Sequence, residues 1–119
     1  MRTGIAIITI GCLGACRSAQ PEVAVPGGDP DRGKVAIAAY GCGACHVIPG
    51  VHEANGLVGP PLTRFARRSY IAGEVPNTAR SLTQWISAPQ SIEPGTAMPD
   101  LGIGPGEARD IAAYLYTLR

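Results

Sequence analysis

The residues of this 119-residue chain best suited to chemistry form the run Cys42-Gly43-Ala44-Cys45-His46. Thiols three positions apart on a helical turn face the same way, so both can reach two vinyl groups on one edge of a porphyrin. The histidine that follows would then lie beneath the iron. A C-x-x-C-H run is the attachment signature of a c-type haem. The run therefore predicts one haem c, covalently held through Cys42 and Cys45, with His46 as an iron ligand.

Three other roles are open to two cysteines at this spacing: a zinc half-site, a thioredoxin-like dithiol and a plain disulfide. A structural zinc ion normally takes four protein ligands, but the sequence after His46 contains no second Cys pair and no His-x-x-x-His run. A dithiol oxidoreductase is expected in a βαβ setting, which the sequence does not indicate. The motif thus favours haem over these alternatives.

A second iron ligand is predicted at Met98, in the proline-flanked stretch 94–99, PGTAMP. A lone methionine is more often a core filler. However, a Pro/Gly loop cannot bury it at helical spacing and can present its thioether at a fixed depth. A soft thioether favours ferrous iron and fills the last coordination position. His52 is the rival ligand, but it follows His46 closely and would have to cross to the opposite face of the haem; exposure in a loop is its alternative fate.

Helices separated by long loops are expected to position these residues. Asp29 is a good N-cap and Pro30 suits the first helical turn, so a helix is predicted from there to near Gly41. Further helices are expected over about 62–70 (a short one), over about 78–88 and from Pro105 onward. No stretch alternates clearly enough to predict a strand. The predicted fold is all-α, with three to five helices and long loops wrapped around one covalent haem.

The composition agrees with a cofactor-filled core. Gly and Pro account for 16 and 11 residues, and aromatic residues for only 5% of the chain, so a core built from side chains alone would be thin. Domains this small often need an added element for stability. The net charge of +1 lacks the basic surplus of nucleic-acid binders, so no nucleic-acid partner is expected.

The N-terminus predicts export and lipid attachment. The apolar run 4–15 has the character of a signal peptide and is too short to span a bilayer comfortably, because about 20 apolar residues are needed for that. Residues 13–16, LGAC, resemble a lipobox, so a lipoprotein-type signal peptide is predicted over 1–15 and a lipid on Cys16. Residues 16–28 are interpreted as a flexible tether and 29–119 as the folded haem-binding domain. An ordinary signal cut near Ser18, leaving a soluble periplasmic protein, is the alternative.

From about residue 29 to 119 the chain resembles a class I c-type cytochrome with one His/Met-ligated haem. The resemblance rests on the C-x-x-C-H run, on Met98 with the proline after it, and on the stretch 59–62, GPPL. It implies that the Pro60 carbonyl accepts a hydrogen bond from the imidazole of His46, fixing its tautomer. It also implies that the first and last helices cross, with small residues such as Gly33 permitting close approach.

The same resemblance implies further haem contacts. Trp85 matches a buried tryptophan near a haem propionate, with simple core packing as the alternative, and Arg68 or Tyr70 is expected to contact the propionates. The stretch 59–102 looks most like modules of bacterial respiratory chains, including those fused to a terminal oxidase subunit.

The function predicted from these residues is single-electron transfer in a respiratory chain by a membrane-tethered carrier, not catalysis. The expected partners are a terminal oxidase, a quinol-oxidising complex or a dehydrogenase, with the membrane reached through the lipid and with no small-molecule substrate. Lys34 is the one lysine, so docking through an apolar rim around the haem edge is predicted, with little electrostatic steering. A haem enzyme or gas sensor with an open iron site is the alternative, and a purely structural subunit is a third possibility.

Overall fold

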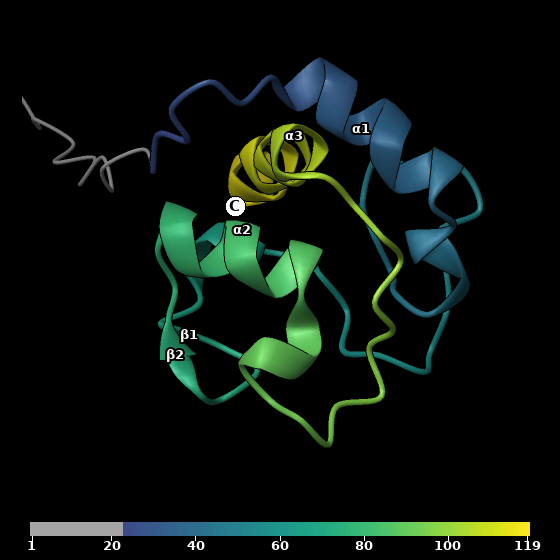
Figure 1. Cartoon of the computed structure of the whole chain (residues 1–119). Helices are drawn as coiled ribbons and strands as arrows, with labels where there is room; N and C mark the ends of the chain where they lie inside the picture. The colour runs from purple at the N-terminus through teal and green to yellow at the C-terminus, as the bar shows by residue number, and fades with distance from the viewer. Residues whose placement is uncertain (1–22) are drawn as a thin grey trace, which may run out of the picture.

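The computed structural model describes residues 23–119. The predicted signal peptide 1–15, the predicted lipid site Cys16 and the first part of the tether lie outside the described residues. The described part holds three α-helices, α1 (Pro30–Ala39), α2 (Ala79–Ser87) and α3 (Pro105–Thr117), three single-turn 3-10 helices, η1 (Cys42–Ala44), η2 (Phe65–Arg67) and η3 (Pro89–Ser91), and the two short strands β1 (Tyr70–Ile71) and β2 (Val75–Pro76) (Figure 1). The predicted all-α fold with three to five helices is confirmed as a mostly helical fold with three α-helices, and the two short strands were not expected.

Capping residues explain where α1 and α2 begin and end. The Asp29 carboxylate accepts hydrogen bonds from two backbone N–H groups of the first turn of α1, and Pro30 follows it. Thr78 caps α2 by accepting from the N–H of Ser81 at 3.1 Å. Pro89 follows the last residues of α2 and cannot continue its hydrogen-bond ladder. These boundaries agree with the helices predicted from the sequence.

The short helix predicted over 62–70 is wrong in most of its length. Arg64 adopts a left-handed φ of 52°, which starts a single 3-10 turn in place of an α-helix. Tyr70 then opens the antiparallel pair β1–β2, in which it lies opposite Pro76. Strands of two residues are too short to show alternation, so the sequence pattern could not reveal them. The side chain of Asn77 secures the hairpin by donating to the Arg68 carbonyl at 3.0 Å.

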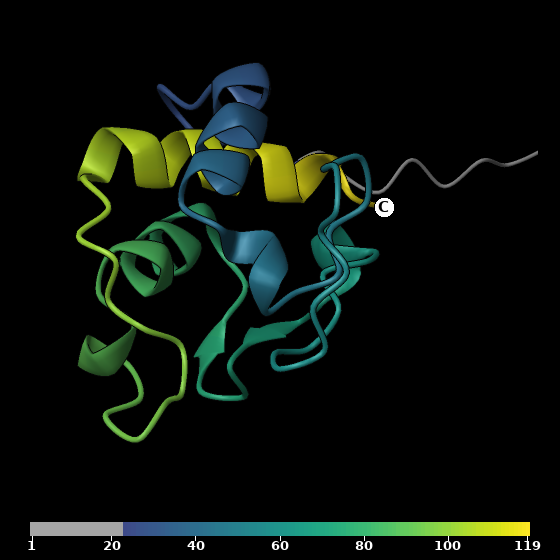
Figure 2. The ribbon, with the colours of Figure 1, turned by 90° about the vertical axis from the view of Figure 1, so that its right-hand side faces the viewer.

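The helix crossing between α1 and α3 is very close. A Cβ placed on Gly33 would lie 1.9 Å from the backbone oxygen of Asp110, so only glycine fits there. Arg32 donates two hydrogen bonds to the Asp110 carboxylate, at 2.9 and 3.0 Å, and the N–H of Asp29 donates a third at 2.8 Å. Figure 2 shows α1 crossing α3 at this point.

The core forms around α3, which lies between α1 and α2 in Figure 1 and contacts both helices. Ala108, Ile111, Ala112 and Leu115 of α3 are buried in it. From the end of η3 the chain runs as a long loop around one side of the molecule and returns to α3 (Figure 1). No helix within residues 23–119 is both long enough and apolar enough to cross a bilayer.

Candidate functional site

A cavity of about 440 Å³ lies inside the ring formed by the helices and loops. That volume is within the range of about 300–1,000 Å³ for cofactor and ligand pockets. Its wall is mainly aliphatic and receives side chains from all three helices: Ile37 from α1, Leu82 and Ile86 from α2, Ile111 and Leu115 from α3. A large apolar ligand would therefore complete the core that the low aromatic content leaves thin.

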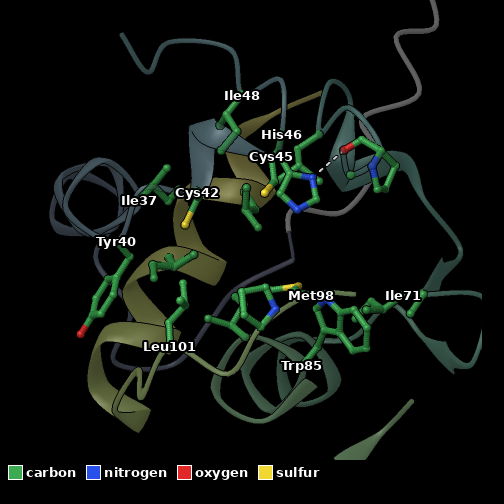
Figure 3. Close-up of a pocket in the computed structure, with 18 of the residues that line it drawn as sticks. Ile37, Tyr40, Cys42, Cys45, His46, Ile48, Ile71, Trp85, Met98 and Leu101 are labelled. Atoms are coloured by element: carbon green, nitrogen blue, oxygen red, sulfur yellow. Dashed lines mark hydrogen bonds between the residues drawn. The ribbon is translucent and has the colours of Figure 1, made fainter. Parts of the chain in front are cut away.

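The two cysteines enter this cavity from η1. Gly41 adopts a left-handed φ of 70° that ends α1, and the 3-10 turn beginning at Cys42 follows at once. Both sulfur atoms point into the cavity (Figure 3), and neither cysteine is in a disulfide. Before the haem is attached, burial raises the pKa of the Cys42 thiol.

The imidazole of His46 lines the same cavity as the two cysteines (Figure 3). Its Nδ1 is 2.8 Å from the carbonyl oxygen of Pro60 (dashed line in Figure 3). A carbonyl can only accept, so Nδ1 carries the proton and Nε2 keeps its lone pair for a metal ion. This is the hydrogen bond that orients a ligating histidine and raises its basicity.

A segment that we call the proximal loop, residues 54–62, is held tightly against the cysteine motif. The N–H of Gly59 donates to the carbonyl of Cys45 at 2.7 Å, and the N–H of Leu62 donates to that of Val47 at 2.8 Å. A Cβ on Gly59 would lie 2.3 Å from Cε1 of His46. Absence of a side chain at this glycine therefore lets the loop reach the imidazole face.

Met98 lies across the cavity from His46. It comes from the segment 92–104, which we call the distal loop, and Figure 3 shows its sulfur on the side opposite the His46 ring. Met98 is not among the buried core residues and lines the cavity instead. Its backbone N–H donates to the Thr96 hydroxyl at 3.1 Å, and its carbonyl accepts from the Gln90 amide at 2.8 Å. The cavity thus receives an imidazole from one side and a thioether from the other.

Two of the three residues predicted to contact the haem propionates line the cavity, and the third does not. Trp85 and Arg68 both line the cavity. The Arg68 guanidinium donates to the carbonyl of Pro61, and lies 5.4 Å from the ring centre of Phe65. Tyr70 is 60% exposed and is not among the lining residues. Which side chains contact the propionates stays a prediction.

His52, the rival iron ligand, lies away from the cavity. Its side chain is 92% exposed and is 3.9 Å from the carboxylate of Glu53. It does not line the cavity, so the site has a single imidazole among its lining residues.

Three residues at the site were not singled out as site residues from the sequence. Gln90 and Thr96 hold the backbone of Met98, and Tyr40 lines the cavity while its phenol donates to Glu107 at 2.6 Å. That hydrogen bond raises the pKa of Tyr40. Thr96 could have been found from its place two residues before Met98. Gln90 carries no comparable signal, because its role depends on a tertiary contact.

The donor set fits a covalently bound haem. Two thiols, an imidazole with a free Nε2 and a facing thioether all reach one mainly apolar cavity. The sequence of residues 30–119 matches the family model described as cytochrome c. This chain belongs to the cytochrome c family. It accordingly carries one haem c bound covalently through Cys42 and Cys45, and the zinc, dithiol and disulfide alternatives are set aside.

A solved structure supports the same fold for this cytochrome c. Cytochrome c2 from Rhodobacter sphaeroides matches it with a TM-score of 0.56 at 20% sequence identity, covering 76% of this chain and 96% of that one. No match was found among curated protein sequences. Members of the cytochrome c family are typically electron carriers, and that is the function the family assigns here.

Proposed function

We propose that this cytochrome c is a monohaem electron carrier in which His46 and Met98 would hold the haem iron, and that it works in a respiratory chain from a membrane tether. The observation that carries the proposal is the placement of the His46 imidazole and the Met98 thioether on opposite sides of the cavity that Cys42 and Cys45 enter. The bound haem supplies a reversible one-electron couple.

The residues of the chain then define what the site can do. His46, with Nδ1 held by Pro60, presents Nε2 to the metal in a fixed orientation. Met98 fills the remaining position with a soft ligand, which favours ferrous iron and raises the potential relative to a second histidine. The aliphatic wall excludes water. Because His46 and Met98 would both be bound to the iron, no coordination position would be left for a substrate, and electron transfer is the activity that remains.

The ligand assignment is tested by the optical spectrum of the ferric holoprotein. Coordination by Met98 gives a weak long-wavelength charge-transfer band, and ferrous protein then binds carbon monoxide slowly. Met98→Ala should abolish the band, accelerate carbon monoxide binding and lower the reduction potential. His52→Ala is the matched control, because that exposed histidine is the rival ligand, and it should leave the band unchanged. Rapid carbon monoxide binding by the wild type would instead favour the haem enzyme or sensor.

The docking surface is proposed to be an apolar rim at the mouth of the cavity. Val58 is 77% exposed and Leu101 is 41% exposed, and both line the cavity, one from the proximal loop and one from the distal loop. Among the residues that line the cavity, apart from His46, the basic and acidic side chains are one arginine, Arg68, and one glutamate, Glu93. Electron-transfer rate should therefore change little with ionic strength; a steep fall on adding salt would contradict an apolar interface.

The proposed tether rests on the sequence of the N-terminus. Lipid on Cys16 would hold the domain at a membrane through residues 16–28, within reach of a terminal oxidase, a quinol-oxidising complex or a dehydrogenase. Cys16→Ser should release the protein into the soluble fraction, whereas Cys12→Ser, in the part expected to be cleaved off, should not. Membrane retention of the Cys16→Ser protein would contradict the lipid. Proteins that co-purify in mild detergent would identify the partner.

A further inference from the structure

The peptide groups of Met98 are held by side chains, although the residue lies outside every helix and strand. Its N–H donates to Thr96 Oγ1 at 3.1 Å, and its carbonyl oxygen accepts from Gln90 Nε2 at 2.8 Å. The Thr96 contact is local, since it spans two residues. The Gln90 contact joins the distal loop to a different element, η3, eight residues earlier in the chain.

Gln90 is a firm point of attachment because its own backbone is fixed. Pro89, just before it, is among the largest fully buried side chains. The hydroxyl of Ser91, just after it, donates to the carbonyl of Ala88 at 2.6 Å, and the N–H of Glu93 donates to the carbonyl of Pro89 at 3.0 Å. The amide of Gln90 therefore reaches Met98 from a turn, η3, that is anchored in the core by the buried Pro89.

We propose that Gln90 is a positioning residue that keeps Met98 in place as the distal ligand. The inference rests on the proposed ligand role of Met98. An intact Gln90 hydrogen bond makes conformations with Met98 turned away less populated. An added ligand can enter only in those conformations, so its apparent affinity reports their population.

The test is titration of the ferric holoprotein with imidazole, followed by loss of the Met-to-iron charge-transfer band. Gln90→Leu keeps much of the side-chain volume and removes the donor. Loss of one such hydrogen bond should lower the apparent dissociation constant for imidazole by about fivefold. Gln90→Lys, which keeps a donor at the end of a flexible chain, should restore most of the wild-type value.

Gln84→Leu is the matched control. Gln84 also donates from an exposed amide, but to the Ser91 hydroxyl at 3.2 Å, so its loss loosens the same turn without touching Met98. It should leave imidazole affinity unchanged. Equal gains of imidazole affinity in Gln84→Leu and Gln90→Leu would overturn the inference, because loosening of η3 would then explain both.

The outcomes separate the inference from the function on which it rests. A wild type that shows the charge-transfer band, together with an unchanged Gln90→Leu titration, overturns the role of Gln90 alone. A wild type without the band overturns the ligand role of Met98 and this inference with it. Should Gln90→Leu fail to yield holoprotein, Gln90→Asn replaces it, because its amide is one methylene too short to reach Met98. The same increase in imidazole affinity is expected, and an unchanged titration would again overturn the role of Gln90.

Discussion

The two faces of the cavity are built in different ways. On the proximal side, two cysteines bind the haem covalently, and the proximal loop is joined to the motif by backbone hydrogen bonds and by a glycine that contacts the His46 ring. On the distal side, Met98 lies in a loop in which the Gln90 amide donates to a backbone carbonyl, while the side chains of Glu93 and Thr96 accept from backbone N–H groups. The proximal face is secured mainly by main-chain and covalent bonds. The distal face also has backbone hydrogen bonds, such as that from the Thr96 N–H to the Glu93 carbonyl at 3.1 Å, but the bonds to Met98 itself come from side chains.

This difference indicates where the protein tolerates change. Backbone hydrogen bonds are present whatever the side chain, but the close glycine contacts leave no space for a larger residue. Single substitutions on the proximal side should therefore be severe. On the distal side a substitution removes one side-chain hydrogen bond, worth about 0.5–1.5 kcal/mol, so the strength of Met98 ligation can be adjusted in small steps.

The largest effect is expected from Cys42→Ser combined with Cys45→Ser. Without thioether bonds the haem is no longer retained covalently, and a cavity of about 440 Å³ is left in a thin core. The purified polypeptide should have the mass of the apoprotein and be largely unfolded by circular dichroism. Met98→Ala, the distal counterpart, should keep its covalent haem. A cooperative, native-like melt of the doubly substituted protein without cofactor would contradict the idea that haem completes the core.

A paired glycine experiment sharpens the comparison. Gly59→Ala would place a Cβ 2.3 Å from Cε1 of a ring that ligation holds still, so the proximal loop must move. We expect a loss of about 1–3 kcal/mol in the free energy of unfolding. Gly95→Ala, in the distal loop, would place a Cβ 3.3 Å from the flexible end of Glu93, which can shift. Its effect should stay within about 1 kcal/mol of zero by denaturant titration of the holoprotein. Equal losses would remove the distinction between the faces.

The helices and the haem motif could be predicted from the sequence because their signals are local. Each helix start is marked by a residue that acts on its near neighbours alone. The caps are Asp29 and Thr78, and the prolines with a fixed φ angle in the first turn are Pro30 and Pro105. The haem attachment motif is likewise local, because the two cysteines and the histidine lie within the five residues 42–46. Met98 was identified from its Pro/Gly loop, and the structure places it on the cavity wall.

Features that arise from contacts between distant segments could not be predicted. The β1–β2 hairpin depends on Asn77, whose side-chain oxygen accepts from the Tyr116 hydroxyl at 2.8 Å, a contact across 39 residues. No sequence motif predicts the contact of Gln90 with Met98. The exposure of Tyr70 follows from its position in a strand that replaced a predicted helix. For each of these residues, the role became clear only once the three-dimensional fold was known.

The smallest effect concerns the helix crossing that supports the proximal side, because η1 follows α1 directly. Asp110 is only 8% exposed, and its pKa is lowered chiefly by the hydrogen bonds from Arg32, then by that from the N–H of Asp29. A carboxyl with a lowered pKa in the folded state stabilises the protein above its unfolded pKa of about 4, and this contribution is lost as the pH falls through the folded value.

Asp110→Asn should therefore be less stable than wild type at pH 7, with the difference in unfolding free energy shrinking as the pH falls below about 4. Asp31→Asn is the control, because Asp31 is an exposed carboxylate on α1, the other helix of the crossing, with no bond to α3 in the described contacts, and its difference from wild type should not change in that way. Hydrogen exchange in acid locates the change: amides of α1 should lose protection before those of α2. Simultaneous loss in both helices would mean that the crossing does not support the proximal side separately.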